Sequence, residues 1–284
     1  MGATLVDQVL TVEVPRQKGS SMRAACLLYH DVIESADWDS SGFTGPGTAK
    51  YKLSRPEFEA HLAAIAKVRE TSSSTAHELA SASDEMLPFL LTFDDGGESA
   101  ATRVAGLLAK YGWRGHFFVT AGQIGRKGFL NTEQIRFLRR EGHVIGSHSF
   151  SHPVRMSHCR KEELTDEWTR SIKILSDILG EQVDTASVPG GYYSNRVGAT
   201  AAAAGVRVLF NSEPTTAVHA ILGCVVVGRY NIFRGMPPGV SGDLVSVHSE
   251  ARSRQWLYWN CKKIAKRVAG RPYLAARQWL LRKG

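Results

Sequence analysis

Leu90-Leu91-Thr92-Phe93-Asp94-Asp95-Gly96-Gly97 is an apolar, β-prone run that ends in two adjacent carboxylates and two glycines. This pattern predicts a buried parallel strand that carries acids to the mouth of a site. Because adjacent residues at a strand end point in different directions, we expect Asp94 and Asp95 to differ in role, one as a metal ligand and the other as a proton acceptor. The alternative is an ordinary turn, since a paired Asp before Gly is common turn chemistry.

Residues 23–31 repeat this pattern at an earlier point of the chain. An apolar run ends in His30 and Asp31, polar groups that the middle of a buried strand would not tolerate, so this is a candidate first strand of the core. Residues 32–50 are rich in Gly, Ser and Asp and predict a long, surface-exposed loop of the kind that contributes to a site. Ser54 as cap and Glu57 at the capping-box position predict a helix that extends to about residue 69.

Strands and helices are expected to alternate from residue 87 onward. The predicted strands are 87–93, 116–120, 143–146, 185–188 and 206–210, with a candidate further strand at 224–227, and the predicted helices are 98–111, 132–141, 161–179 and 195–204. Such alternation indicates βα units and a mainly parallel sheet, either open or closed into a barrel. Repeated Asp, His and Gly at the carboxyl ends of strands favour a barrel-like site at that face. Helical sequence follows Pro238.

Composition indicates a soluble globular protein, and we expect no membrane span. The 284 residues contain no apolar run near the roughly 18 residues needed to cross a bilayer. Acids and a proline stand near the start, where a secretory signal would be apolar, so we expect no signal peptide. The four cysteines lie far apart with no Cys-x-x-Cys pair, which argues against a zinc knuckle or a redox motif. A reducing, cytoplasmic location is therefore expected.

The excess of positive over negative charge lies entirely in the C-terminal tail of the chain. Residues 251–284 hold ten Lys or Arg and no acid, so the net charge of +8 leaves −2 on the rest of the chain. The cationic and aromatic side chains concerned are Lys262, Lys263, Lys266, Arg267, Trp256, Tyr258, Trp259 and Trp279. They fit a solvated helical face with aromatic residues packed inward, or peripheral contact with an anionic membrane. Nucleic acid would satisfy the same charges but is not the expected partner.

Gly146-Ser147-His148-Ser149-Phe150-Ser151-His152-Pro153 forms a second constellation after a short strand. Two histidines four apart can converge on one ion if they lie on a helical turn, which must end at His152 because Pro153 follows. Two surface loop histidines are the alternative. With an acid at the end of another strand, one carboxylate and two imidazoles would leave open positions, as in a catalytic site for Zn²⁺ or a similar first-row ion.

These stretches resemble the motifs of the polysaccharide deacetylase, or NodB-homology, family. Thr92-Phe93-Asp94-Asp95-Gly96 matches its first motif and residues 147–152 its second, in the same order and at a similar separation. The resemblance, from roughly residue 24 to 227, implies an α/β fold with a distorted (β/α) barrel, for which we expect about seven parallel strands. It implies Asp94 as general base and Asp95, His148 and His152 as ligands of a divalent transition metal, with Zn²⁺ expected. We expect the barrel domain to comprise residues 1–238. Residues 239–284 are expected to form a basic helical extension that packs on the barrel or projects from it.

The family's third motif usually begins with an arginine that orients the base, but this chain has Ser187 there, in Ser187-Val188-Pro189-Gly190-Gly191. This loop could still offer the Gly190 N–H to a developing oxyanion, or could be only a turn. The last motif, Leu-x-x-His-Asp, supplies the acid for the leaving amine. Leu27-Leu28-Tyr29-His30-Asp31 fits it better than the segment before His248, and it resembles a circularly permuted branch that includes poly-N-acetylglucosamine deacetylases.

The residues and the resemblance together predict a metal-dependent hydrolase that removes an N-acetyl group from an amino sugar in a polysaccharide, glycolipid or activated precursor. The expected partner is a carbohydrate that carries an N-acetylhexosamine, and Tyr192 and Tyr193 could line its site. Hydrolysis of another amide, such as a formamide or cyclic ureide, is one alternative. The other is an inactive barrel that binds a membrane surface or carbohydrate. His116 begins a strand on the opposite side and is expected to be structural.

Overall fold

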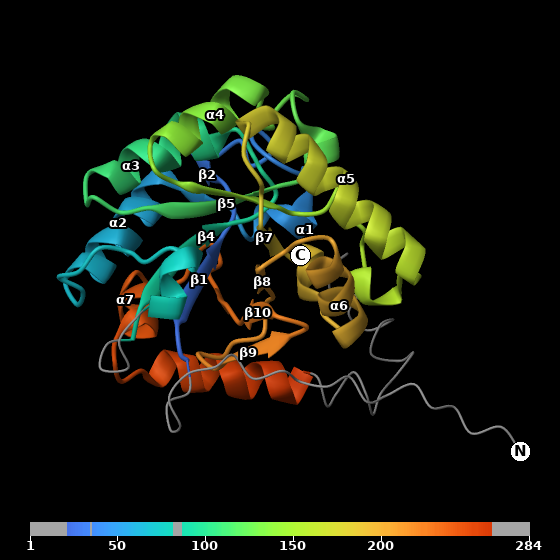
Figure 1. The fold of residues 1–284 in the computed structure, drawn as a ribbon. Helices are drawn as coiled ribbons and strands as arrows, with labels where there is room; N and C mark the ends of the chain where they lie inside the picture. Colours follow the sequence, from blue (N-terminus) through green and yellow to red (C-terminus); the bar gives the residue numbers. More distant parts are fainter. Residues whose placement is uncertain (1–21, 35, 82–86, 263–284) are drawn as a thin grey trace, which may run out of the picture.

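A computed structural model describes residues 22–34, 36–81 and 87–262 of the chain (Figure 1). Its centre is a nine-stranded sheet in the order β11-β1-β4-β5-β6-β7-β8-β10-β9. In that order the strands are Tyr230–Asn231, Ala25–Tyr29, Phe89–Phe93, Gly115–Val119, Val144–Ser147, Thr185–Ser187, Val208–Phe210, Cys224–Val227 and Val218–Ile221. All neighbours are parallel except β10 and β9. The sheet curls into a half-barrel, which confirms the predicted α/β fold with a distorted barrel.

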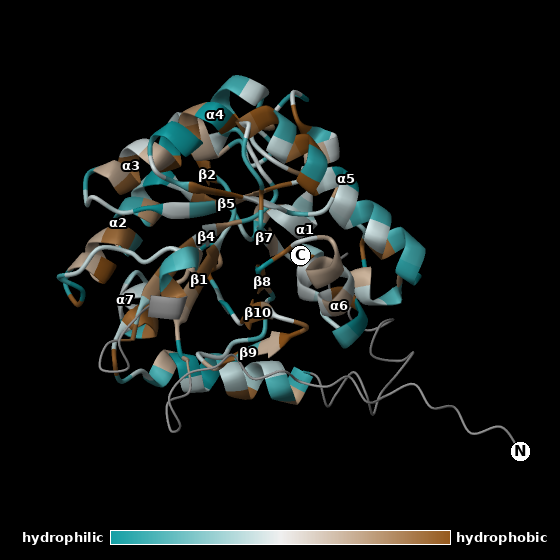
Figure 2. Ribbon diagram, in the orientation of Figure 1, coloured by the Kyte–Doolittle hydropathy of each residue, from teal (hydrophilic) through white to brown (hydrophobic). Residues whose placement is uncertain are grey.

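Helices cover the convex face of this sheet. They are α2 (Arg55–Ala66), α3 (Ala105–Ala109) with a π-helical turn before it (Ala100–Val104), α4 (Thr132–Arg140), α5 (Lys161–Leu179), α6 (Asn195–Ala203) and α7 (Gly239–Val245). A four-residue helix, α1 (Pro46–Ala49), and a small two-stranded sheet of β2 (Val32–Ile33) and β3 (Leu53–Ser54) lie in the connections. The apolar side chains of the helices and strands face one another, and the hydrophilic residues of the helices face outward (Figure 2). Among the described residues, no helix is both long and apolar enough to cross a membrane.

The predicted helix starts and strand positions are confirmed. Ser54 Oγ accepts from the Glu57 N–H and the Glu57 carboxylate accepts from the Ser54 N–H at 2.8 Å, which is the expected capping box. Asn131 and Gln134 form a second capping box at the start of α4. The predicted helix after Ser54 was too long, because α2 ends at residue 66.

The expectation of a surface-exposed loop over residues 32–50 was wrong in part. β2 is buried, and Ser41 is fully buried as well. The loop folds inward onto the buried Asp31 carboxylate, which accepts hydrogen bonds of 2.6 Å from both Ser41 Oγ and Ser99 Oγ. The buried Lys52 ammonium donates to the carbonyls of Trp38, Ser41 and Phe43 at 2.6–2.7 Å. Polar side chains that satisfy backbone groups therefore hold this segment at the rim of the sheet.

The chain after Pro238 contributes to the core before it reaches the basic tail. Leu244 and Val245 of α7 are fully buried, and a Cβ at Gly242 would come within 2.6 Å of the Ala64 carbonyl oxygen of α2. α7 is therefore packed closely on α2. Residues 250–262 form a further helix along the edge of the half-barrel (Figure 1). Lys263, Lys266, Arg267 and Trp279 of the predicted basic surface lie outside the described residues.

Two buried histidines make the fold sensitive to acid. His116, expected to be structural, is fully buried in β5: its Nε2 accepts from the Ala76 N–H at 2.8 Å, and its Nδ1 lies 3.1 Å from the Leu91 carbonyl oxygen. His143 Nδ1 accepts from the Gly115 N–H at 3.1 Å. Burial lowers the pKa of each imidazole from 6.5 to about 4. Between these pH values the unfolded chain binds protons that the folded protein does not, so stability falls as the pH falls.

The free energy of unfolding should fall between pH 7 and pH 4.5. We expect this fall to be about 2 kcal/mol smaller in His143→Asn than in the unchanged protein. Urea denaturation at the two pH values measures this difference. The matched control is His248→Asn, because the His248 side chain is exposed. An unchanged pH slope in His143→Asn would contradict the prediction.

Candidate active site

The carboxyl ends of the strands meet around one cavity of about 1280 Å³. Asp94 and Asp95 follow β4, His148 follows β6, and His30 follows β1. All four side chains line this cavity, as do His152, Gly190, Tyr192 and Tyr193. His248 does not line it and is exposed beyond α7. The structure therefore brings together the predicted site residues and, of the two candidate acids, includes only His30.

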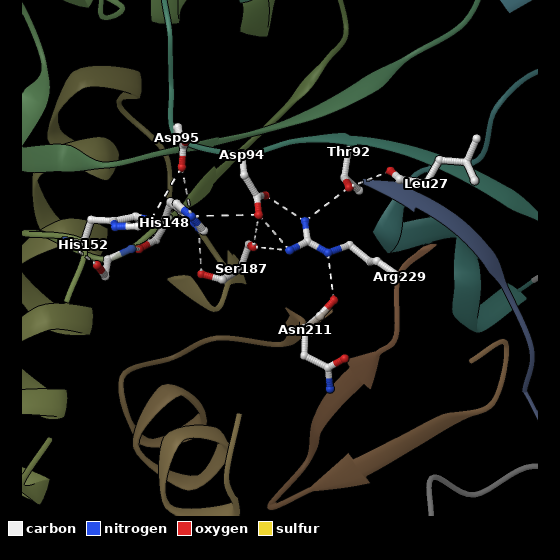
Figure 3. A network of polar contacts seen from close by, with 11 residues as sticks. Leu27, Thr92, Asp94, Asp95, His148, His152, Ser187, Asn211 and Arg229 are labelled. Carbon is white, nitrogen blue, oxygen red and sulfur yellow. Dashed lines mark hydrogen bonds and ion pairs between the residues drawn. The ribbon is translucent and has the colours of Figure 1, made fainter. Parts of the chain in front are cut away.

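Asp95, His148 and His152 are arranged as a group that could hold a metal ion. One ligand atom from each lies within 4.8 Å of the others. Asp95 Oδ1 is 3.5 Å from Nε2 of both histidines (Figure 3). The Nδ1–H of His148 donates a hydrogen bond of 3.1 Å to the Ser187 carbonyl oxygen, which leaves the Nε2 lone pair available to a metal ion beside Asp95. This donor set fits a divalent ion with open positions for water and substrate.

The two histidines lie on a loop, so the prediction of a helical turn was wrong. Ser149 and His152 have φ values of 62° and 61°, in the left-handed region that a right-handed helix excludes. The Glu167 carboxylate of α5 holds the loop, because it accepts from the N–H groups of Phe150 and Ser151 at 2.9 and 2.8 Å. The convergence of the imidazoles thus depends on loop geometry fixed by a distant acid.

Asp95 is buried and remains ionised. Burial by itself raises the pKa of the Asp95 carboxyl, but the neighbouring imidazoles of His148, His30 and His152 outweigh it and hold that pKa below its usual range. Burial, and then the neighbouring His148 imidazole, lower the pKa of His152. A negative carboxylate beside a neutral imidazole is the protonation state that metal binding requires.

Asp94 is held by a buried arginine that the sequence analysis did not identify. The two terminal nitrogens of Arg229 donate to Oδ1 and Oδ2 of Asp94 at 2.7 and 2.8 Å (Figure 3). The same guanidinium donates to Ser187 Oγ at 2.7 Å, to Thr92 Oγ1 at 3.2 Å and to the Asn211 carbonyl oxygen at 2.8 Å. Its side chain is fully buried. Because every contact orients the planar group, Arg229 fixes the Asp94 carboxylate in one position.

The contact between Arg229 and Asp94 supplies the guanidinium that the third motif lacks. Ser187 stands where an arginine was expected, and its hydroxyl donates to Asp94 Oδ2 at 3.1 Å, beside the guanidinium. Arg229 reaches the carboxylate from the end of β10 instead. A signal was present in the sequence: Arg229 follows an apolar strand after one glycine, just as Asp94 follows its strand. Burial raises the pKa of Asp94, but Arg229 and then His148 outweigh burial, and the net shift is downward.

His30 and Gly190 occupy the cavity wall. The His30 ring lies 4.9 Å from the Tyr51 ring, and its Nδ1 is buried without a hydrogen-bond partner among the described residues. Gly190 has φ 61° inside the turn Pro189–Gly191, a conformation that favours glycine. Their roles as acid and as oxyanion donor stay predictions.

Comparison with known proteins agrees with this geometry. Residues 85–209 match the family model described as polysaccharide deacetylase. The match covers less than half of the chain, and over this segment the chain is similar to polysaccharide deacetylases. The segment contains Asp94, Asp95, His148, His152 and Gly190, whereas His30 and Arg229 lie outside it. Because the match begins after β1, the circular permutation inferred for His30 stays a prediction.

Relatives that are similar to this chain come from bacteria and fungi. YxkH of Bacillus subtilis is 26% identical over 163 residues, which are 57% of this chain and 56% of YxkH. The peptidoglycan-N-acetylglucosamine deacetylase of Bacillus cereus is 27% identical over 172 residues, 58% of this chain and 73% of the relative. A chitin deacetylase of Arthroderma benhamiae is 28% identical over 151 residues, 52% of this chain and 40% of the relative. The chain thus spans only about half the length of some of these deacetylases.

Solved structures share the fold. The Streptococcus pyogenes deacetylase PplD, in complex with acetate, superposes with a TM-score of 0.64 at 19% identity, over 77% of this chain and 96% of that one. IcaB from Ammonifex degensii has a TM-score of 0.63 at 23% identity, over 80% and 99% of the two chains. These likenesses extend the common fold beyond the segment that the family model matches.

Proposed function

We propose that the protein removes the acetyl group from an N-acetylated amino sugar of a glycan, with a divalent metal ion as cofactor. The observation that carries this proposal is the metal-ligand group Asp95, His148 and His152 beside the Arg229-held carboxylate of Asp94, in one cavity. The family match of residues 85–209 supports a deacetylase. The names of two relatives, a peptidoglycan-N-acetylglucosamine deacetylase and a chitin deacetylase, support an N-acetylated amino sugar as substrate.

Asp95, His148 and His152 would hold the metal, for which we propose Zn²⁺. A carboxylate with two imidazoles is a ligand set that suits Zn²⁺ and similar ions. Such an ion supplies a Lewis acid for the amide carbonyl and lowers the pKa of water at the site. Ser187 contributes through its carbonyl oxygen, which accepts a hydrogen bond from the His148 Nδ1–H and so orients the ring.

Asp94 is suited to accept the proton of the attacking water. Its Oδ1 accepts one hydrogen bond, from Arg229, among the described residues and so keeps a lone pair for that proton. The water oxygen then bonds to the acetyl carbon, and the carbonyl oxygen becomes an oxyanion. Gly190, by its position on the cavity wall, would donate its N–H to this oxyanion. His30 would protonate the sugar nitrogen as the carbon–nitrogen bond breaks, which yields acetate and the free amine.

Acetate release tests this function. Metal content is first measured on the purified protein, and acetate is then assayed with neutral N-acetylhexosamine oligomers, nucleotide sugars and lipid-linked sugars. We expect release from at least one substrate, loss of release after chelation and its return when Zn²⁺ is added. Asp95→Asn should bind no metal, while Asp166→Asn, an exposed acid of α5, should leave metal and activity unchanged. The proposal fails if Asp95→Asn keeps both metal and activity.

A further inference from the structure

The helix of residues 250–262 forms a wall of the catalytic cavity. Five of its residues line that cavity: Arg254, Gln255, Tyr258, Trp259 and Lys262. Gln255 Nε2 donates to the Asn231 carbonyl oxygen at the end of β11, at 3.0 Å. Arg252 donates to the carbonyls of Leu244, Ser246 and Val247 after α7. These bonds fix the helix beside the site, although the family match ends far before it, at residue 209.

The cavity-lining residues of this helix form two adjacent rows. Arg254, Tyr258 and Lys262 are four residues apart and share one face, and Gln255 and Trp259 form the next row. The Lys262 ammonium lies 5.3 Å from the centroid of the Tyr258 ring. Residues eight apart span about 12 Å along a helix, so the row presents cations at both ends of an aromatic surface. Aromatic faces stack on sugar rings, while Lys and Arg bind anions.

Four cations line the cavity among the described residues, Lys50, Lys52, Arg254 and Lys262, and the last two lie on this helix. Asp94 is neutralised by Arg229, and the Lys52 ammonium is occupied by three carbonyls. Apart from Asp94 and Asp95, Glu213 is the one carboxylate among the described residues that line the cavity. Arg254 pairs with Glu250 at 2.9 Å, but both side chains are at least 80% exposed, so water and salt weaken this pair. The guanidinium can therefore turn to a ligand.

We propose that Arg254, Tyr258, Trp259 and Lys262 form a subsite for a negatively charged group of the substrate, a phosphate or a carboxylate, next to the sugar that is deacetylated. This inference rests on the proposed deacetylation and narrows its substrate class to anionic glycans or activated sugars. The cations bind the anionic group, and the aromatic rings pack against the neighbouring sugar or base. A neutral oligomer fills the same cavity but forms no ion pair with these cations.

Kinetics with matched substrates test the subsite. The rate constant kcat/KM for acetate release is measured with a neutral N-acetylglucosamine tetramer, with UDP-N-acetylglucosamine for phosphate, and with an N-acetylmuramic acid oligomer for carboxylate. We expect R254Q/K262Q to lower kcat/KM on an anionic substrate about tenfold or more and on the neutral tetramer less than about twofold. K262R should retain the preference. K173Q, which removes a cation of α5 outside the cavity, should change neither value. Loss with only one anionic substrate identifies the group that the subsite takes.

Equal losses on neutral and anionic substrates would overturn the subsite and leave the deacetylase function intact. If no substrate releases acetate, the proposed function fails. The subsite is then tested separately by calorimetry, which measures ligand binding without turnover. In that case tighter binding of UDP-N-acetylglucosamine than of N-acetylglucosamine, abolished in R254Q/K262Q, supports it, and equal binding overturns it. Trp256 and Leu257 of the same helix are exposed apolar residues. A membrane surface is therefore the alternative partner of this helix. Binding to phosphatidylglycerol vesicles that R254Q/K262Q abolishes, with unchanged kinetics on soluble anionic substrates, would replace the subsite by a membrane contact.

Discussion

Arg229→Met is expected to lower the free energy of unfolding by about 3–5 kcal/mol and to reduce kcat/KM for acetate release at least about a hundredfold. The side chain is fully buried and donates five hydrogen bonds, two of them to Asp94. Its removal leaves a buried carboxylate without its counter-charge. It also frees that carboxylate to rotate away from the position from which it can accept a proton.

A double-mutant cycle separates the ion pair from the bulk of the side chain. Asp94→Asn in the Arg229→Met background removes the unpaired charge, so the double variant should be more stable than the sum of the single changes by about 2 kcal/mol or more. Urea denaturation measures each free energy. The matched control is Arg139→Met, because the Arg139–Glu181 pair is about half exposed and its loss should cost less than about 1 kcal/mol. Additive single and double variants would mean that Arg229 and Asp94 do not interact energetically.

The pH profile distinguishes orientation of the base from simple support of the fold. Arg229 is the main group that lowers the pKa of Asp94 against the effect of burial. A base with a lowered pKa stays ionised to lower pH, so the acid limb of kcat/KM should move to higher pH in Arg229→Lys, whose single ammonium cannot donate to both carboxylate oxygens in the same way. An acid limb that does not move, with reduced stability, would leave Arg229 as a purely structural residue.

Local chemistry in the sequence accounts for the strands, the helix starts and the metal group. Capping boxes at Ser54 and Asn131, and apolar runs that end in Asp94 or His148, depend on near neighbours only, and near neighbours can be read from a sequence. The half-barrel also brings together strand ends that carry polar residues, as parallel sheets do. This is why an acid of the Asp94–Asp95 pair could be grouped with His148 and His152 before their distances were known, while the choice of Asp95 as the ligand came from the family resemblance.

The contact between Arg229 and Asp94 could not be predicted from the sequence, because it depends on the curvature of the sheet. Arg229 lies between β10 and β11 at the two sides of the half-barrel: four strands separate β10 from β4, whereas β1 alone separates β11 from β4. The amount of curl that joins them depends on side-chain packing over the whole sheet, which no local pattern specifies. The same holds for the helix of residues 250–262. Its basic and aromatic pattern is readable, but its place on the cavity wall depends on bonds from Gln255 and Arg252 to distant carbonyls.

His30→Ala is expected to lower kcat for release of acetate from an N-acetyl sugar by about 10²–10⁴ with little change in KM, because a general acid acts only on the departing group. His248→Ala should stay within about twofold of the unchanged protein, because His248 is exposed and outside the cavity. His30 instead follows β1 into the cavity, with an Nδ1 that is buried and unpartnered among the described residues.

An ester substrate tests whether His30 acts as an acid. The phenolate that leaves an aryl acetate needs no proton, whereas a sugar amine does. His30→Ala should therefore retain most of its activity on 4-methylumbelliferyl acetate, while Asp94→Asn should lose activity on both substrates, since both require an activated water. Equal losses of His30→Ala on the ester and the amide would exclude the acid role. Loss in His248→Ala with retention in His30→Ala would assign the acid to the other end of the chain and remove the case for a permuted order of motifs.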